Sequence, residues 1–308
     1  MKVLSLFDGM SCGRVALERA GLPVTTYFAS ELDKYAIAIA QKNYPSTVQL
    51  GDVRVVREMA EAGFFGHMDL LIGGSPCQGF SFSGKQLAFD DPRSVLFFEF
   101  VRILRALQKD NPNIKFLLEN VKMKKEHLNV ITSFLGVNPV FINSALVSAQ
   151  NRQRYYWANW PISQPADRGI LLKDIIENSI TGAAFRGRPH SKFEIRKDKK
   201  SNAILSDGHQ SRLIHVGSSN GTNQQHSRIY CVEGKSPTLM TRDLGGGHSV
   251  KITYDRNNYR KLTPVECERL QTLPDNYTAG VSDTQRYRML GNGWTVEVVA
   301  HIFRGLRA

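Results

Sequence analysis

Strand-like and helix-like segments alternate through the first 160 residues, and this alternation constrains the fold more than any other feature. Short apolar, β-rich runs occupy Val3–Phe7, Thr25–Ser30, Met68–Ile72, Lys115–Leu118, Val140–Val147 and Tyr155–Trp160. Segments with helical character lie at Arg14–Ala20, Leu32–Lys42 and Ser94–Leu107. Alternating strands and helices are typical of a parallel sheet with helices on both faces. The sequence therefore predicts a doubly wound α/β fold.

Polar or reactive side chains come directly after several strand positions. These residues are Asp8, Glu31, Asp52, Cys77 and Glu119. In open α/β sheets, ligands bind at the carboxyl ends of the strands. We therefore expect these five side chains to contribute to one shared site.

The rest of the chain divides into two further parts. Residues 161–260 are rich in Gly, Ser, Asn, His and Arg and show little periodicity, which indicates a second, loop-rich domain. Regular structure returns with a helix over Thr263–Gln271, where Thr263 is the expected N-cap and Pro264 the first helical residue. A second amphipathic helix is expected over Trp294–Leu306. The predicted domains are thus 1–160, 161–260 and 261–308, with the last part returning to the first domain.

The chain is basic, with a formal net charge of +12. Residues 161–260 carry a net charge of +7, more than half of this excess. A basic surface favours a polyanionic partner, because basic groups near phosphate release condensed counterions. Solubility alone is the alternative explanation. No apolar run approaches the ~20 residues of a membrane helix, so we expect a cytoplasmic protein without a membrane partner.

Two local patterns suggest chemistry without deciding it. Residues 7–13, FDGMSCG, form a glycine-bearing turn between a strand and a helix, where backbone approaches a ligand closely. The turn is not GxGxxG, so a dinucleotide oxidoreductase is not favoured. Glu31 and Asp52 suit ribose hydroxyls and an adenine amino group. For either residue alone a helix cap or surface acid is the better interpretation, and the ordered series of acids after successive strands weakens that alternative. The four cysteines form no metal-binding pattern.

Residues 73–86, GGSPCQGFSFSGKQ, place Cys77 on a glycine- and serine-rich loop after a strand. A thiolate on such a loop can be activated by nearby backbone N–H groups or cations. This segment resembles the Pro-Cys-Gln motif of the C5-cytosine DNA methyltransferases. Further motifs of that family follow in its order: FDGMSCG, Glu31, Gly51-Asp52-Val53, Glu119-Asn120-Val121, Gln150-Asn151-Arg152-Gln153-Arg154, Leu262–Pro274 with RLQTLP, and Gly291-Asn292-Gly293-Trp294.

The resemblance covers almost the whole chain and points to bacterial or phage enzymes. FDGMSCG and LFFEF near residue 96 also look like the vertebrate de novo DNA methyltransferases. Two positions depart from the family pattern: Leu32 stands where Trp is common, and Gly293 stands where many members have Ser. Thr238-Leu239 resembles the Thr-Leu pair of family recognition domains.

The resemblance implies a Rossmann-like S-adenosylmethionine-dependent methyltransferase sheet with a smaller target-recognition domain. The implied activity moves a methyl group to carbon 5 of a cytosine rotated out of duplex DNA. Cys77 attacks C6, and Glu119 acts at N3. Arg154 contacts O2, and Arg152 holds the site near the cysteine.

The resemblance also assigns binding residues. The implied cofactor-binding residues are Phe7, Asp8, Gly9, Met10, Cys12, Gly13, Glu31, Leu32, Asp52, Val53, Gly74, Pro76, Leu96, Asn292, Gly293 and Trp294. The implied DNA-binding residues are Ser81, Ser83, Lys85 and Arg93 on a closing loop, together with Thr238 and Arg242.

Two alternatives stay open from the sequence. A tRNA cytosine methyltransferase shares this catalytic set, although the hundred residues after Trp160 favour DNA. A catalytically silent DNA-binding relative is the other, and retention of Cys77 and Glu119 argues against it. We expect a monomer on double-stranded DNA, with S-adenosylmethionine converted to S-adenosylhomocysteine. The recognised DNA sequence and a cognate restriction endonuclease cannot be read from the chain.

Overall fold

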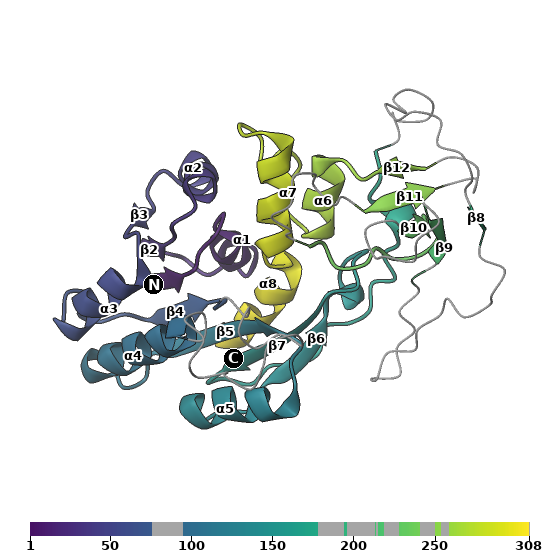
Figure 1. Cartoon of the computed structure of the whole chain (residues 1–308). Helices are drawn as coiled ribbons and strands as arrows, with labels where there is room; N and C mark the ends of the chain where they lie inside the picture. Colours follow the sequence, from purple (N-terminus) through teal and green to yellow (C-terminus); the bar gives the residue numbers. More distant parts are fainter. Residues whose placement is uncertain are drawn as a thin grey trace. The chain divides into compact units, whose positions relative to one another are not determined.

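The structure, a computed structural model, describes residues 1–75, 95–177, 194–195, 213, 215–218, 228–240, 250–253 and 259–307. The chain forms two compact units (Figure 1). The first contains Met1–Ile142, Gln153–Gln164 and Val298–Ala308, and the second contains Asn143–Arg152 and Pro165–Glu297. The predicted domain boundaries at residues 160 and 261 separate a cofactor-binding part from a target-recognition part. They are defined by function rather than by compactness, so they stay a prediction.

The first unit is built on a seven-stranded sheet with the order β3-β2-β1-β4-β5-β7-β6. The strands are β1 (Lys2–Leu6), β2 (Thr26–Ser30), β3 (Val48–Gln49), β4 (Leu70–Gly73), β5 (Lys115–Val121), β6 (Val140–Asn143) and β7 (Gln153–Ala158). Strands β1 to β5 pair in parallel, and β7 pairs antiparallel to β5. The chain order reverses between β1 and β4, which is where doubly wound sheets bind ligands.

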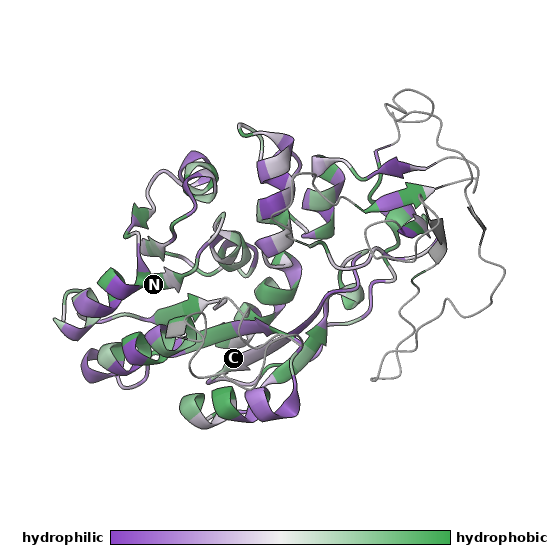
Figure 2. Ribbon diagram, viewed as in Figure 1, coloured by the Kyte–Doolittle hydropathy of each residue, from purple (hydrophilic) through white to green (hydrophobic). Residues whose placement is uncertain are grey.

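Strand alternation divides the core between the two faces of this sheet. Leu4 and Leu6 of β1 belong to one buried cluster, together with Phe116 and Leu118 of β5. That cluster also contains the buried sides of α3 (Val53–Glu61), α4 (Val95–Asp110) and α5 (Lys125–Leu135). Helix α1 (Cys12–Arg19) lies on the opposite face (Figure 1). Banding of hydrophobic and hydrophilic residues along the helices fits this arrangement (Figure 2).

Helices α2, α3 and α6 begin where a polar side chain accepts from free backbone N–H groups. Asp33 caps α2 (Lys34–Asn43) by accepting from the backbone nitrogens of Tyr35 and Ala36. The sequence analysis placed helices close to α1, α2 and α4 but gave none for α3 or α5. Helix α5 carries Lys124 and Lys125 at its start, where the helix dipole disfavours positive charge, so its N-terminal signal is weak.

One predicted strand is too long. The expected strand Val140–Val147 ends at Asn143, and Ser144–Leu146 form a 3-10 turn. The side chain of Asn143 accepts from the backbone N–H of Ala145 and thereby caps the turn. This local hydrogen bond competes with the strand ladder, as asparagine side chains often do.

The second unit contains a five-stranded sheet with the order β12-β11-β10-β9-β8. Its strands are β8 (Glu194–Ile195), β9 (His215–Ser218), β10 (Arg228–Cys231), β11 (Lys251–Thr253) and β12 (Arg260–Lys261). It also contains α6 (Pro264–Leu270) and α7 (Asp283–Asn292), of which α7 was not predicted. Helix α8 (Val296–Arg304) and the 3-10 turn Gly305–Arg307 belong to the first unit from Val298 onward. Together they start two residues later than the predicted Trp294–Leu306 helix and end one residue later.

The prediction of an α/β, Rossmann-like sheet is confirmed by the strand order and pairing. The capping box predicted for α6 is also present: Thr263 accepts from the backbone of Glu266, whose carboxylate accepts from the backbone of Thr263. Among the described residues, no helix is both long and apolar enough to cross a membrane.

Candidate active site

Adjacent strand ends bring distant residues together in the first unit. Strands β1, β4 and β5 are neighbours in the sheet. Asp8 and Ser75 lie two residues after the ends of β1 and β4, and Glu119 lies two residues before the end of β5. These residues are 67 and 44 positions apart in sequence, so only the parallel pairing makes them neighbours in the sheet. The expected shared site of Asp8, Glu31, Asp52, Cys77 and Glu119 stays a prediction, because Cys77 lies outside the described residues.

The turn of residues 7–11 has an unusual backbone. Phe7 and Ser11 adopt φ values of 57° and 64°, in the left-handed region, and Gly9 adopts 59°. Left-handed geometry costs a residue other than glycine about 1–2 kcal/mol. The turn therefore depends on its surroundings to hold this shape. The Gly9 N–H donates to Glu31 Oε2 over 2.8 Å, which ties the turn to the end of β2.

The Asp8 carboxylate faces inward and accepts three hydroxyl groups. Its Oδ1 accepts from Ser5 Oγ at 2.6 Å and Tyr27 Oη at 2.7 Å, and its Oδ2 accepts from Ser11 Oγ. Burial raises the pKa of Asp8 to about 6, although the hydroxyl groups of Ser11, Ser5 and Tyr27 act in the opposite direction. The negative charge of Glu31 adds a smaller upward contribution.

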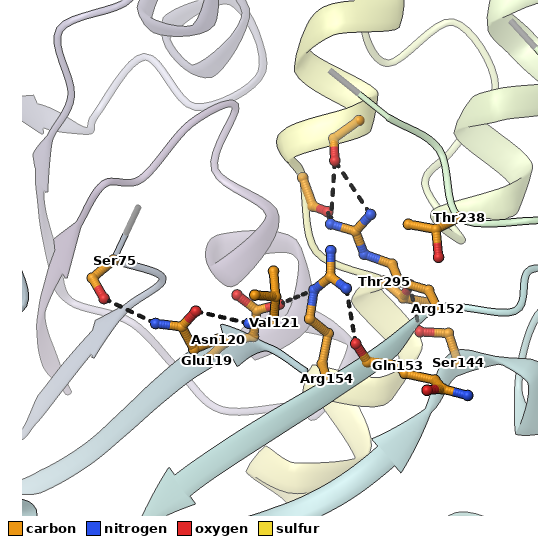
Figure 3. Close-up of polar contacts among 12 residues, drawn as sticks. Ser75, Glu119, Asn120, Val121, Ser144, Arg152, Gln153, Arg154, Thr238 and Thr295 are labelled. Carbon is orange, nitrogen blue, oxygen red and sulfur yellow. Dashed lines mark hydrogen bonds and ion pairs between the residues drawn. The ribbon is translucent and has the colours of Figure 1, made fainter. Parts of the chain in front are cut away.

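Glu119 and Arg154 form an ion pair on neighbouring antiparallel strands (Figure 3). Arg154 Nε lies 2.7 Å from Glu119 Oε1, and the two side chains are only 13% and 10% exposed. Arg154 Nη1 also donates to the carbonyl oxygen of Gln153 at 2.8 Å. A pair this well shielded from water interacts far more strongly than a surface pair, and its orientation is fixed at two points.

Asn120 connects the end of β5 to the segment that follows β4 (Figure 3). Its side-chain nitrogen donates to Ser75 Oγ at 3.2 Å, and its oxygen accepts from the Val121 backbone. Ser75 comes two residues before Cys77 in the sequence. Cys77 lies outside the described residues, as do Pro76, Ser81, Ser83, Lys85, Arg93 and Arg242.

Arg152 lies in the second unit, where its guanidinium contacts backbone carbonyl oxygens (Figure 3). It donates to Gly291 at 3.2 Å, to Gly293 at 2.9 Å and to Leu239 at 3.4 Å. The side chain is almost fully buried. Arg152 therefore braces the Gly291–Gly293 segment, which carries the expected C-terminal motif.

The Thr238-Leu239 pair is held against the segment before Arg152. The Thr238 hydroxyl donates to the carbonyl oxygen of Asn151 at 2.7 Å. The Leu239 N–H donates to the side-chain oxygen of Gln150 at 3.0 Å. The pair is thus positioned by Gln150 and Asn151, which belong to the second unit as it does.

The other residues expected at the cofactor site differ in exposure. Asp52 caps α3 by accepting from the Arg54 backbone and pairs with the Arg54 side chain, which lowers the pKa of Asp52. Leu32 is 70% exposed beside Glu31. The buried members are Met10, Cys12, Gly13 and Val53, the half-buried members are Phe7, Gly9, Gly74, Leu96, Gly293 and Trp294, and Asn292 is exposed.

The sequence analysis did not single out Ser5, Tyr27 or Ser75. Ser5 and Tyr27 lie on the same face of neighbouring strands, because Ser5 follows Val3 by two residues and Val3 pairs with Tyr27. The only sequence signal for a buried polar contact was the presence of a serine and a tyrosine within otherwise apolar strands. Their partner could not be identified without the strand register.

Comparisons with known proteins identify the family of the chain. The family model for C-5 cytosine-specific DNA methylase matches residues 1–308, the whole chain. The chain belongs to the C-5 cytosine-specific DNA methylases. As a member of this family, it is a DNA cytosine-5 methyltransferase.

Relatives of this methylase include two bacterial type II methyltransferases. M.NlaX of Neisseria lactamica is 30% identical over 325 residues, covering 100% of this chain and 96% of the relative. M1.ScrFI of Lactococcus lactis subsp. cremoris is 31% identical over 320 residues, covering 97% of this chain and 76% of the relative. Among solved structures, the S. pombe Dnmt2 methyltransferase has a TM-score of 0.64 at 19% identity, covering 99% of this chain and 97% of the other, which supports the fold.

Proposed function

We propose that this methylase transfers a methyl group from S-adenosylmethionine to C5 of a cytosine that is rotated out of a specific duplex DNA sequence. The observation that carries the proposal is the shielded Glu119–Arg154 pair at the strand ends next to the segment that leads to Cys77. Family membership supplies the reaction class. Asn120 supports the site by linking the Glu119 strand to Ser75.

The proposed chemistry starts at Cys77. Its thiolate adds to C6 of cytosine, which breaks the C5–C6 double bond and makes C5 nucleophilic. S-adenosylmethionine, when bound, supplies an electrophilic methyl group on a sulfonium centre. After C5 has taken the methyl group, loss of the C5 proton and release of the Cys77 thiolate restore the aromatic ring. Such covalent catalysis divides one difficult substitution into easier steps.

Glu119 and Arg154 stabilise the charge that develops on the cytosine ring. Thiolate addition places electron density on N3 and O2, so a hydrogen-bond donor at N3 and a cation at O2 stabilise the transition state. In the structure each side chain fixes the other at 2.7 Å. We assign N3 to Glu119, which donates there in its protonated form because an ionised carboxylate can only accept. We assign O2 to Arg154, because a guanidinium donates at several points and can keep the Glu119 contact while it binds O2.

The residues around the 7–11 turn fit an adenosyl cofactor. The Glu31 carboxylate accepts three backbone N–H groups, from Gly9, Leu32 and Asp33, and a carboxylate has capacity for about four. It can therefore accept one more donor, such as a ribose hydroxyl. A Cβ atom added at Gly9 would meet no atom within 4 Å apart from its chain neighbours, so the turn has space for a ligand at this point.

The DNA contacts remain proposals as well. Ser81, Ser83, Lys85 and Arg93 supply hydroxyl groups and positive charge on the segment after Cys77, while Thr238 and Arg242 lie in the region expected to recognise bases. We propose that one monomer binds one duplex site. Extrusion of the target base costs a few kcal/mol, which these contacts offset.

The first test measures methyl transfer. Purified protein and a Cys77→Ser variant are incubated with plasmid DNA, separately with tRNA, and with labelled S-adenosylmethionine, and the DNA is read by base-resolution sequencing. We expect 5-methylcytosine in one short sequence context and none with Cys77→Ser. Methyl transfer to tRNA but not to DNA would show that tRNA is the substrate. Methyl transfer to neither nucleic acid would overturn the proposed activity.

A further inference from the structure

The buried Asp8 carboxylate is not explained by contact with a ligand. Both of its oxygens accept hydroxyl groups of the protein, from β1, β2 and the start of α1. The side chain is 9% exposed. A direct role at the cofactor would require one of these internal hydrogen bonds to be shared or replaced.

The backbone around Asp8 supplies the second observation. Phe7 and Ser11, on either side of Asp8, are both in the left-handed region. The Ser11 N–H donates to the carbonyl oxygen of Asp8, and the Asp8 N–H donates to the carbonyl oxygen of Ser30. Asp8 therefore contributes its backbone and its side chain to a turn that would otherwise relax.

We propose that Asp8 is a positioning residue, which holds the turn of residues 7–11 in the conformation that receives the cofactor. The inference rests on the proposed binding of S-adenosylmethionine at this turn. The carboxylate acts through the hydroxyl groups of Ser11 and Tyr27, because these fix the far end of the turn to β2. Gly9, between the two strained residues, keeps its N–H directed at Glu31.

The protonation state of Asp8 should give cofactor affinity a characteristic dependence on pH. A protonated carboxyl group is itself a donor, so at least one of the three hydroxyl groups must reverse its hydrogen bond or lose it. Burial raises the pKa of Asp8 from 3.8 to about 6. The titratable groups that act on Asp8 are Tyr27 on β2 and Glu31 after β2, and the Arg14 guanidinium lies 5.3 Å from the Tyr27 ring centroid.

The sign of the stability effect is opposite to that of the binding effect. Because the folded-state pKa is the higher one, protonation of Asp8 favours the folded state as the pH falls from above 6 towards 3.8. The same protonation loosens the turn. We therefore expect cofactor affinity to fall below pH 6 without a matching loss of stability from this group.

The experiment compares full-length wild type with Asp8→Asn, Asp8→Ala and Tyr27→Phe. Equilibrium dialysis with labelled S-adenosylmethionine gives Kd between pH 5.5 and 8, and thermal unfolding monitors the fold. Asp8→Ala removes the carboxylate that accepts three hydroxyl groups, so it should raise Kd by about 10- to 100-fold at pH 7.5. Tyr27→Phe should raise it less, and Asp8→Asn should lose the weakening near pH 6.

The matched control is Tyr44→Phe. Tyr44 also places its ring near Arg14, at 5.4 Å, but its hydroxyl donates to Glu18 rather than to Asp8. We expect its Kd and pH profile to match wild type. Binding lost in the Asp8 variants but unchanged in Tyr27→Phe would mean direct contact with the cofactor and overturn the inference. Unchanged Kd in all variants would overturn it too, whereas absence of binding by wild type would instead count against the proposed function.

Discussion

At the scale of residues, the orientation of Glu119 depends on its partner Arg154. Arg154 reaches Glu119 through Nε and the Gln153 carbonyl through Nη1. A lysine has one nitrogen at its tip and cannot hold both contacts with the same orientation. The guanidinium therefore fixes the direction of the Glu119 carboxyl group as well as its charge.

Arg154→Lys should slow the chemical step while leaving cofactor affinity unchanged. Removing one donor that stabilises transition-state charge typically costs about 10²–10³ in rate. Single-turnover methylation at saturating S-adenosylmethionine measures this step. Arg102→Lys, on the half-exposed side of α4, is the control and should stay within about twofold of wild type. An equal loss of methylation rate in both variants would contradict a specific role for Arg154.

At the scale of elements, α6 is a helix whose ends and sides are held by buried polar contacts. The Thr263 hydroxyl accepts from the Glu266 backbone and donates to Glu177 at 2.6 Å. Glu266 also pairs with Arg260 at 2.6 Å, with no exposed surface on its own side chain. A buried carboxylate with four hydrogen-bond donors is well satisfied, so the helix start is firmly fixed.

Thr263→Ala should lower the free energy of unfolding by about 1–2 kcal/mol, because it removes an N-cap and a second hydrogen bond. Urea denaturation followed by circular dichroism measures the change. Thr263→Ser keeps the hydroxyl group and should lose less than half as much. If the serine variant were as unstable as the alanine variant, the packing of the methyl group, not the cap, would explain the effect.

At the scale of the whole molecule, the net charge of +12 makes DNA binding an electrostatic event. Each phosphate that a basic residue neutralises releases condensed counterions into solution. For about six such contacts, the affinity for DNA should fall roughly 10³-fold between 50 and 200 mM salt. Fluorescence anisotropy with a labelled duplex tests this expectation. Affinity that does not depend on salt would mean that the positive charge serves solubility alone.

Local sequence determined much of this protein. The capping box at Thr263 and Glu266 joins residues three apart, and strand and helix periods are local as well, so the fold class and most elements of the sheet could be predicted. Helices with weak local signals were missed: α5 starts with two lysines and contains the β-branched residues Val130, Ile131 and Thr132. The order of motifs along the chain was enough to indicate the family, because motif order is itself a property of the sequence.

Only the tertiary structure decided which side chains meet. Glu119 and Arg154 are brought together by the antiparallel pairing of β5 with β7. Tyr27 reaches Asp8 because β1 and β2 pair in parallel, and Arg152 finds the Gly291 carbonyl 139 residues away. The register between distant strands is set by the packing of the entire core, since a slip of one residue would turn every side chain to the other face. The local sequence pattern therefore determines which face of each helix or strand is apolar. The packing of the core determines which side chains of different elements come into contact.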